Sequence, residues 1–236
     1  MRMRTMRRGG AIGVAVVALV ICAMPASAAP GDGSAYAVEV AVTVPGEPGA
    51  RVGPLARSST SGPTTAIVPT VHASGIVTSG AAASSATLDQ DTGIPHAQAD
   101  LADVGIGLAA LTGRIGAVNA SCDATQAGVK GATTLANVRL PGVRVPANPG
   151  RNHVVDLRAA KIVFNEQTEN GNGGLTVNAV HIYLHRSAGR GNIVLSSARC
   201  GPACPPVPLA SGLGLWLGLG LLAIPAAVAV RKRRAA

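Results

Sequence analysis

Three kinds of side chain in this sequence could do chemistry: cysteines, a closely spaced histidine pair and paired carboxylates. Once the leader described below is removed, Cys122, Cys200 and Cys204 remain, an odd number for an oxidising compartment. We predict a Cys122–Cys200 disulfide, because each residue ends a predicted strand and closing a loop of about 78 residues is stabilising. Cys200–Cys204, across a tight Gly-Pro-Ala turn, and Cys122–Cys204 are the alternatives.

His181 and His185 have the i, i+4 spacing that places two metal ligands on one face of a helix. Ile182 and Leu184 alternate with His181, Tyr183 and His185, however, as in a β-strand. On a strand, positions i and i+4 are about 13 Å apart, too far for both imidazoles to reach one ion. We therefore predict a solvated strand face and no metal site.

The carboxylates give no stronger signal. Asp89 and Asp91 begin like a calcium loop, but Ile94 and Pro95 stand where the sharp turn needs glycine, so we predict a polar turn. Glu166 and Glu169 resemble the carboxylate pair of a hydrolase, but they flank a predicted hairpin turn, where glutamates are usually solvated. Nucleophile-elbow and phosphate-loop motifs are absent from the sequence, so we predict no catalytic residues and no cofactor.

The elements that would position these residues are short runs of small and β-branched residues broken by Gly, Pro and Asn. Tyr36–Val44 alternates, with Tyr36 and the valines on one face, as a half-buried strand does. Repeated prolines in residues 45–70 indicate a loop or edge strands. Nine further strands are predicted along the rest of the chain. Their spacing of roughly ten residues is typical of a β-sandwich or a partly open barrel. They lie around 71–79, 81–88, 97–110, 112–121, 133–140, 153–157, 160–165, 174–185 and 191–199, with a hairpin turn at 170–174.

The two ends of the chain carry targeting signals. Four arginines, an apolar run and the A-x-A site ending at Ala28 form a signal peptide, so we predict cleavage between Ala28 and Ala29. Residues 213–230 carry no charge and would form a helix of about 27 Å, long enough to cross a bilayer. Four basic residues follow in the tail 231–236, which places the tail in the cytoplasm and the preceding body outside.

A Pro-rich stalk, residues 201–212, joins the body to this span. It ends in Pro208, Leu209, Ala210, Ser211 and Gly212, which together with the apolar run and basic tail are similar to a degenerate sortase signal. That similarity implies cell-wall attachment through cleavage between Ser211 and Gly212. The alternative is a plain membrane helix, which the hydropathy requires in either case.

Net charge excludes one class of partner. The chain has a formal charge of +9, but four arginines belong to the leader and four basic residues to the tail, leaving 12 Lys and Arg against 11 Asp and Glu. The external part is therefore nearly neutral and has few aromatic residues for base stacking. We predict no nucleic-acid binding.

Three segments carry a family resemblance: Asn165-Glu166-Gln167-Thr168, Leu175–Ile182 and Ile193–Cys200. With Ala99-Asp100-Leu101 and Val118–Cys122 upstream, residues 70–200 resemble the actinobacterial choice-of-anchor P surface proteins. The resemblance implies an exported domain joined to a C-terminal anchor, and it implies no catalytic residues.

These observations divide the chain into six parts: signal peptide 1–28, N-terminal strand and Pro/Ser/Thr-rich loop 29–70, β-rich domain 71–200, stalk 201–212, span 213–230 and tail 231–236. We expect an all-β, cell-surface structural or interaction protein that presents loops such as 45–70 and 141–152 to the cell wall or to other surface proteins. A carbohydrate- or wall-binding module is the first alternative, and a surface hydrolase is the second.

Overall fold

Small β-branched residues and well-placed turn residues produce an all-β structure. The computed structural model describes residues 29–46, 49–108, 111–125 and 127–204, and these contain fourteen strands and no helix. The strands are β1 (Gly33–Thr43), β2 (Ala50–Leu55), β3 (Ser58–Ser59), β4 (Thr65–Val68), β5 (Val71–Ala73), β6 (Val77–Ser79), β7 (Ala82–Leu88), β8 (Pro95–Leu108), β9 (Leu111–Thr125), β10 (Gly128–Ala136), β11 (His153–Asp156), β12 (Ala160–Asn170), β13 (Gly174–Leu184) and β14 (Arg190–Cys200).

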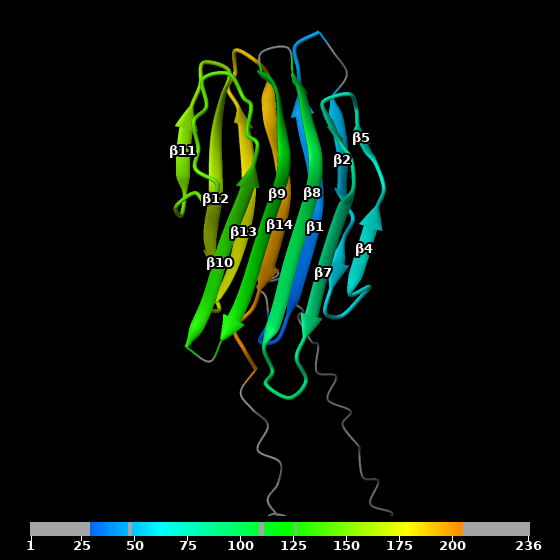
Figure 1. Cartoon of the computed structure of the whole chain (residues 1–236), viewed down its shortest axis with the longest axis vertical. Coiled ribbons are helices and arrows are strands. Elements are labelled where there is room, and N and C mark those ends of the chain that lie inside the picture. Colours follow the sequence, from blue (N-terminus) through cyan, green and yellow to red (C-terminus); the bar gives the residue numbers. More distant parts are fainter. Residues whose placement is uncertain (1–28, 47–48, 109–110, 126, 205–236) are drawn as a thin grey trace, which may run out of the picture.

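The strands form two antiparallel sheets that pack face to face (Figure 1). Sheet A has the order β11-β12-β13-β14-β1-β2, with β3 also paired to β1. Sheet B has the order β10-β9-β8-β6-β5, with β7 on β8 and β4 on β7. Apolar side chains from both sheets fill the space between them, among them Phe164, Ile115 and Leu195. The predicted all-β class is confirmed, and the arrangement is that of a sandwich.

Residues 29–70 belong to the same sandwich as residues 71–200. β1 lies between β14 and β2 in sheet A, so the N-terminal strand is central rather than an appendage. The prediction of loop or edge strands for 45–70 is confirmed for edge strands, because β2, β3 and β4 form there. They lie outside the central strands β1 and β7, where an unpaired edge tolerates proline.

The inward-facing pattern of sheet A shifts by one residue along a row that crosses four strands. Ala37, Asn165, Ala179 and Ser196 occupy this row, between ladder pairs whose register is the same on both sides. Asn165 and Ser196 have φ of 50° and 53°, in the left-handed region that is uncommon for residues other than glycine. All four are buried. Residues two positions apart on one strand normally face the same side of the sheet. Across this row they face opposite sides.

This shift corrects the face predicted for β1. Ala37 and Val38 are both fully buried, and the inward series then continues with Val40 and Val42. Tyr36 is therefore out of phase with the valines, and its hydroxyl forms a hydrogen bond to Ser197. A strictly alternating pattern could not reveal a shift that neighbouring strands impose together.

The sheets approach closely at Gly131 on β10. A Cβ atom there would lie 2.9 Å from Leu175 Cδ2 and closer still to Val177 Cγ2. Gln167 Nε2 on β12 donates to the Gly131 carbonyl oxygen at 3.0 Å, which joins the two sheets by a polar contact. Glycine is required here because the facing β-branched Val177 has little freedom to move.

The two ends of the described chain leave the sandwich together (Figure 1). Gly31 N donates to Pro202 O at 2.8 Å, and Gly201 N donates to Asp32 O at 2.7 Å. We call this the terminal end. The opposite, distal end contains Thr43, Leu108, Leu111 and Arg190. Cys204 N also bonds to Gly93 O, so the first residues of the predicted stalk pack on the domain.

Candidate functional site

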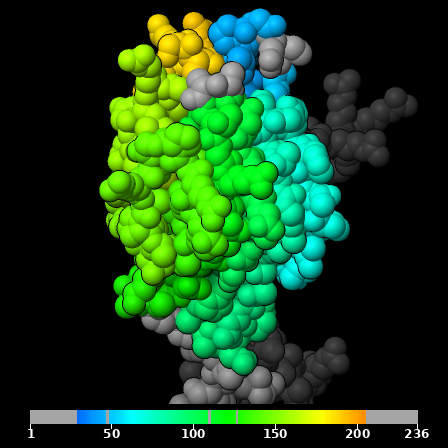
Figure 2. Space-filling model, turned by 45° about the horizontal axis from the view of Figure 1, so that its top comes forward, coloured from blue at the N-terminus to red at the C-terminus, as the bar shows by residue number. Residues whose placement is uncertain are grey.

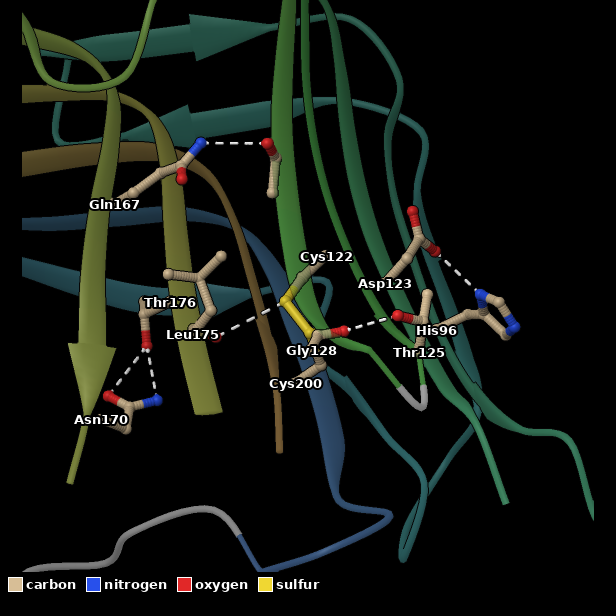
Figure 3. The surroundings of a disulfide bond; sticks show 11 residues. His96, Cys122, Asp123, Thr125, Gly128, Gln167, Asn170, Leu175, Thr176 and Cys200 are labelled. Atoms are coloured by element: carbon tan, nitrogen blue, oxygen red, sulfur yellow. Dashed lines mark hydrogen bonds and ion pairs between the residues drawn. A yellow bond between two sulfur atoms is a disulfide. The ribbon is translucent and has the colours of Figure 1, made fainter. Parts of the chain in front are cut away.

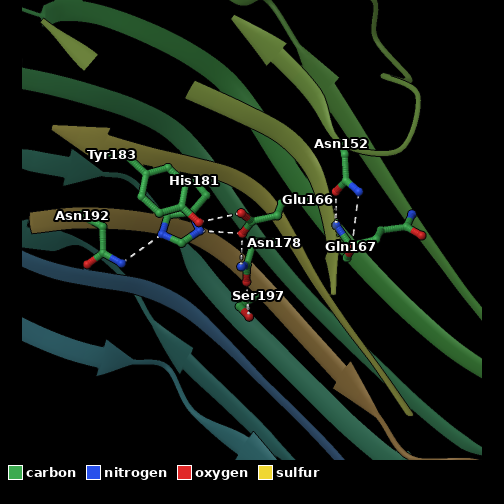
Figure 4. A network of polar contacts seen from close by, with 8 residues as sticks. All are labelled: Asn152, Glu166, Gln167, Asn178, His181, Tyr183, Asn192 and Ser197. Carbon is green, nitrogen blue, oxygen red and sulfur yellow. Dashed lines mark hydrogen bonds and ion pairs between the residues drawn. The ribbon is translucent and has the colours of Figure 1, made fainter. Parts of the chain in front are cut away.

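The densest polar cluster in the described structure is centred on Glu166 of β12, on the outer side of sheet A (Figure 4). Its carboxylate accepts three hydrogen bonds: from Tyr183 Oη at 2.6 Å, from Asn178 Nδ2 at 2.8 Å and from His181 Nδ1 at 2.5 Å. Ser197 Oγ in turn donates to Asn178 Oδ1 at 2.7 Å. The side chain of Glu166 is only 16% exposed and that of His181 only 10%.

His181 is held at both ring nitrogens. Asn192 Nδ2 lies 2.9 Å from Nε2, so Nε2 accepts and Nδ1 carries the proton that is donated to Glu166. The imidazole stacks on Tyr183, with ring centroids 3.9 Å apart. Lys161 Nζ lies 4.7 Å from the centroid of the Tyr183 ring. The imidazole is thus fixed in position and in tautomer.

The fold brings these residues together through strand register. Glu166, Asn178, Ser197 and Tyr36 stand side by side in one row across β12, β13, β14 and β1. This row follows directly after the row at which the inward pattern shifts. Without the shift, Glu166 would share the inward orientation of Phe164 two positions earlier, and its charge would face the core.

The cluster has strong electrostatic consequences. Burial alone would raise the pKa of Glu166, but hydrogen bonds from His181, Tyr183 and Asn178 outweigh it and lower the pKa to about 2. Burial raises the pKa of Tyr183, and the Glu166 carboxylate raises it further. Burial also raises the pKa of Tyr36 to about 12. At neutral pH Glu166 is therefore an ionised carboxylate that accepts hydrogen bonds from three side chains.

The depressed pKa predicts a stability loss in acid. Glu166 has an ordinary pKa of 4.5 and about 2 in the fold, so its contribution is complete above pH 4.5 and disappears as the pH falls towards 2. Between these pH values we expect the free energy of unfolding to fall by about 2–3 kcal/mol more for the wild-type protein than for a Glu166→Gln variant. Urea unfolding between pH 5.5 and 2.5 measures the difference. Equal losses in both proteins would contradict the assignment.

A Glu, a His and a Ser in one cluster suggest a nucleophilic triad, but the geometry differs. Ser197 bonds to Asn178 rather than to His181, and both ring nitrogens of His181 are already engaged. The described residues contain no group of three metal-ligating side chains. The arrangement orients and fixes side chains on the sheet surface, where it stiffens β12, β13 and β14 against one another.

The Cys122–Cys200 disulfide is confirmed (Figure 3). It joins β9 of sheet B to β14 of sheet A at the terminal end, with Cα atoms 5.8 Å apart and both residues fully buried. Neither alternative pairing of these two cysteines is present. The bridge spans the two layers, so it fixes their separation as well as their register.

Two predictions for surface residues were wrong. Glu166 does not flank the turn as a solvated residue, because β12 continues to Asn170 and Glu166 lies well inside it. His181 is not on a solvated face, because Glu166 and Tyr183 cover it. The polar residues alternating with Ile182 and Leu184 were a usable signal, but a single strand does not show which side chains face them from its neighbours.

The remaining candidates stand apart from the cluster. His185 lies beyond β13, with Nε2 3.5 Å from Asp156 Oδ1, so it shares no site with His181. Glu169 pairs with Arg151 at 2.9 Å on the surface. Asp89 forms a polar turn, as predicted: Oδ1 accepts from the backbone N–H groups of Asp91 and Thr92, which lower its pKa. The hairpin turn after Asn170 is also confirmed.

Several predictions fall outside the described residues: the signal peptide up to Ala28, the sortase-like residues Pro208, Leu209, Ala210, Ser211 and Gly212, the span 213–230 and the tail. In the part of the chain that is described, no helix is long and apolar enough to cross a membrane. No family model, curated protein or solved structure matches this chain.

Proposed function

We propose that this chain is an exported cell-surface scaffold, held by its C-terminal segment to the membrane or the wall, which presents the distal end of a rigid sandwich. The observation that carries the proposal is the position of the ends. Residues 29–33 and 200–204 lie side by side at one end, so a C-terminal anchor leaves the other end free to face outward.

The structure of the body supports a passive role. The inter-sheet disulfide suits an oxidising exterior. The Glu166 cluster is closed by its own hydrogen bonds, and the Tyr183 ring stacks on His181 with Lys161 Nζ 4.7 Å from its centroid. A ring engaged in this way argues against stacking of a sugar at this cluster. The resemblance to choice-of-anchor P proteins is part of the same proposal.

Cell fractionation combined with intact mass measurement tests it. We expect the mature protein in the membrane or wall fraction, with Ala29 as its first residue and Cys122 bonded to Cys200. Release only by wall-digesting enzymes, with a C-terminus at Ser211, would identify wall attachment, and release by detergent would identify the membrane helix. Unprocessed, reduced protein in the cytosol would overturn the proposal.

A further inference from the structure

The charges of the sandwich are segregated along its length, although their sum is almost zero. Six arginines cluster at the distal end, within about three residues of strand ends or in the connecting turns. We call them the basic cap: Arg51, Arg114, Arg139, Arg158, Arg186 and Arg190. Figure 2, with this end turned forward, shows the end of β1 beside the β13–β14 connection.

Carboxylates are concentrated at the opposite end. Among the described residues, the terminal end holds the five acidic residues Asp32, Asp89, Asp91, Asp123 and Glu169. At the distal end, Asp156 is the one described carboxylate close to the strand ends, and it lies 3.5 Å from His185. Asp103, further along β8, lines a cavity with Arg114 and Arg139. Lys130, Arg151 and Arg199 offset part of the negative charge at the terminal end. The sandwich is therefore an electric dipole whose positive pole is the distal end, farthest from the termini.

The cap arginines are exposed and available to bind an external anion. All six are exposed, and none takes part in the four ion pairs of the described structure. Unpaired guanidinium groups gathered at one end are the feature that carboxylate and phosphate groups recognise, because each can form two parallel hydrogen bonds.

Two hollows in the cap give such anions a place to sit. One, of about 430 Å³, is lined by two cations, Arg114 and Arg139, together with Asn137, Thr78 and one carboxylate, Asp103. The other, of about 450 Å³, lies between the β11–β12 and β13–β14 connections and is lined by Arg158, Ser187 and Thr112. Each hollow combines a cation with hydroxyl or amide groups, the mixture that suits an anionic and hydroxyl-rich ligand.

We propose that the basic cap binds an acidic polysaccharide of the cell envelope. This rests on the proposed function for the location of the partner. A strand of eleven residues is about 36 Å long, which holds the cap away from a membrane that anchors the terminal end. The cap surrounds a tip instead of forming a flat face or a linear stripe, so it fits a flexible sugar chain better than a bilayer or a rigid duplex. It contains no aromatic residue for base stacking.

Binding of polygalacturonate to the full-length chain in neutral detergent tests this inference. We expect the triple variant Arg158→Gln, Arg186→Gln and Arg190→Gln to weaken binding about tenfold at low salt. The matched control, Arg57→Gln, Lys130→Gln and Arg151→Gln, removes the same charge far from the cap and should change affinity less than twofold. Wild-type affinity should also fall as salt increases.

Three outcomes would overturn the inference: equal loss in both triple variants, affinity that does not depend on salt, or tighter binding to duplex DNA or to phosphatidylglycerol vesicles than to polygalacturonate. Urea unfolding of both variants verifies that each remains folded. Binding is measured on purified protein, so it does not depend on where the protein is located in the cell. If the cap variant and the control variant bind equally well, this inference is refuted even where fractionation supports anchoring. A cytosolic location refutes the proposed function even where polygalacturonate binds.

Discussion

Replacing Cys122 and Cys200 by serine should lower the free energy of unfolding by about 4 kcal/mol. The bridge closes a segment with a sequence separation of 78, and in the chain-entropy description its removal enlarges the unfolded ensemble by about this amount. Both residues are fully buried between the sheets, so the two hydroxyl groups would add a desolvation cost. Urea unfolding at neutral pH, with and without a reducing agent, measures the effect.

The matched control is Cys204→Ser, which leaves the inter-sheet bridge intact and should have a much smaller effect. The reducing agent should destabilise the wild-type protein and the control, but not the double variant. If the double variant unfolds at the wild-type urea concentration, the bridge is not the covalent tie between the sheets.

Replacing Glu166 by alanine should lower the free energy of unfolding by about 3 kcal/mol, the second large effect that we expect. This change removes the acceptor for His181, Tyr183 and Asn178 together, and it leaves their donors poorly solvated beneath the surface. In a domain of this size such a loss lowers the melting temperature by about 6–12 °C. Thermal unfolding followed by circular dichroism is the measurement.

Glu169→Ala provides a comparison in the same strand. Glu169 is three residues away and also forms one ion pair, but its side chain is 73% exposed. We therefore expect its replacement to lower the free energy of unfolding by less than about 1 kcal/mol. Similar melting temperatures for the two variants would show that the Glu166 cluster contributes no more than an ordinary surface pair.

Sequence patterns were sufficient for properties that depend on one segment at a time. The alternation and turn residues predicted β1 and the strands β7 to β14, and the Asn/Gly run placed the β12–β13 turn. They did not locate β2, β3 and β4, and they merged β5 and β6 into one strand. The disulfide could also be predicted, because Cys122 and Cys200 each lie near the end of a strand and close a long loop. These features depend on local propensity and chain entropy, which a sequence expresses directly.

The Glu166 cluster could not be predicted because it depends on agreement among four strands. Asn165 and Ser196 adopt left-handed backbone angles that their residue types permit but do not require. Only the shared shift turns Glu166 to the outer face of the sheet, within reach of His181. The basic cap has a similar origin, because a net charge near zero carries no information about how the turns distribute the arginines in space.

The bridge at the terminal end also determines how the protein would respond to being pulled. Tension on an anchor attached beyond Cys204 would enter the domain at the end of β14, a strand with hydrogen-bonded neighbours on both sides. The sulfur–sulfur bond would pass part of that load to β9 before the β14 ladder had to yield. A surface protein built this way would resist drag with two layers at once, and its reduced form would be expected to extend at lower force.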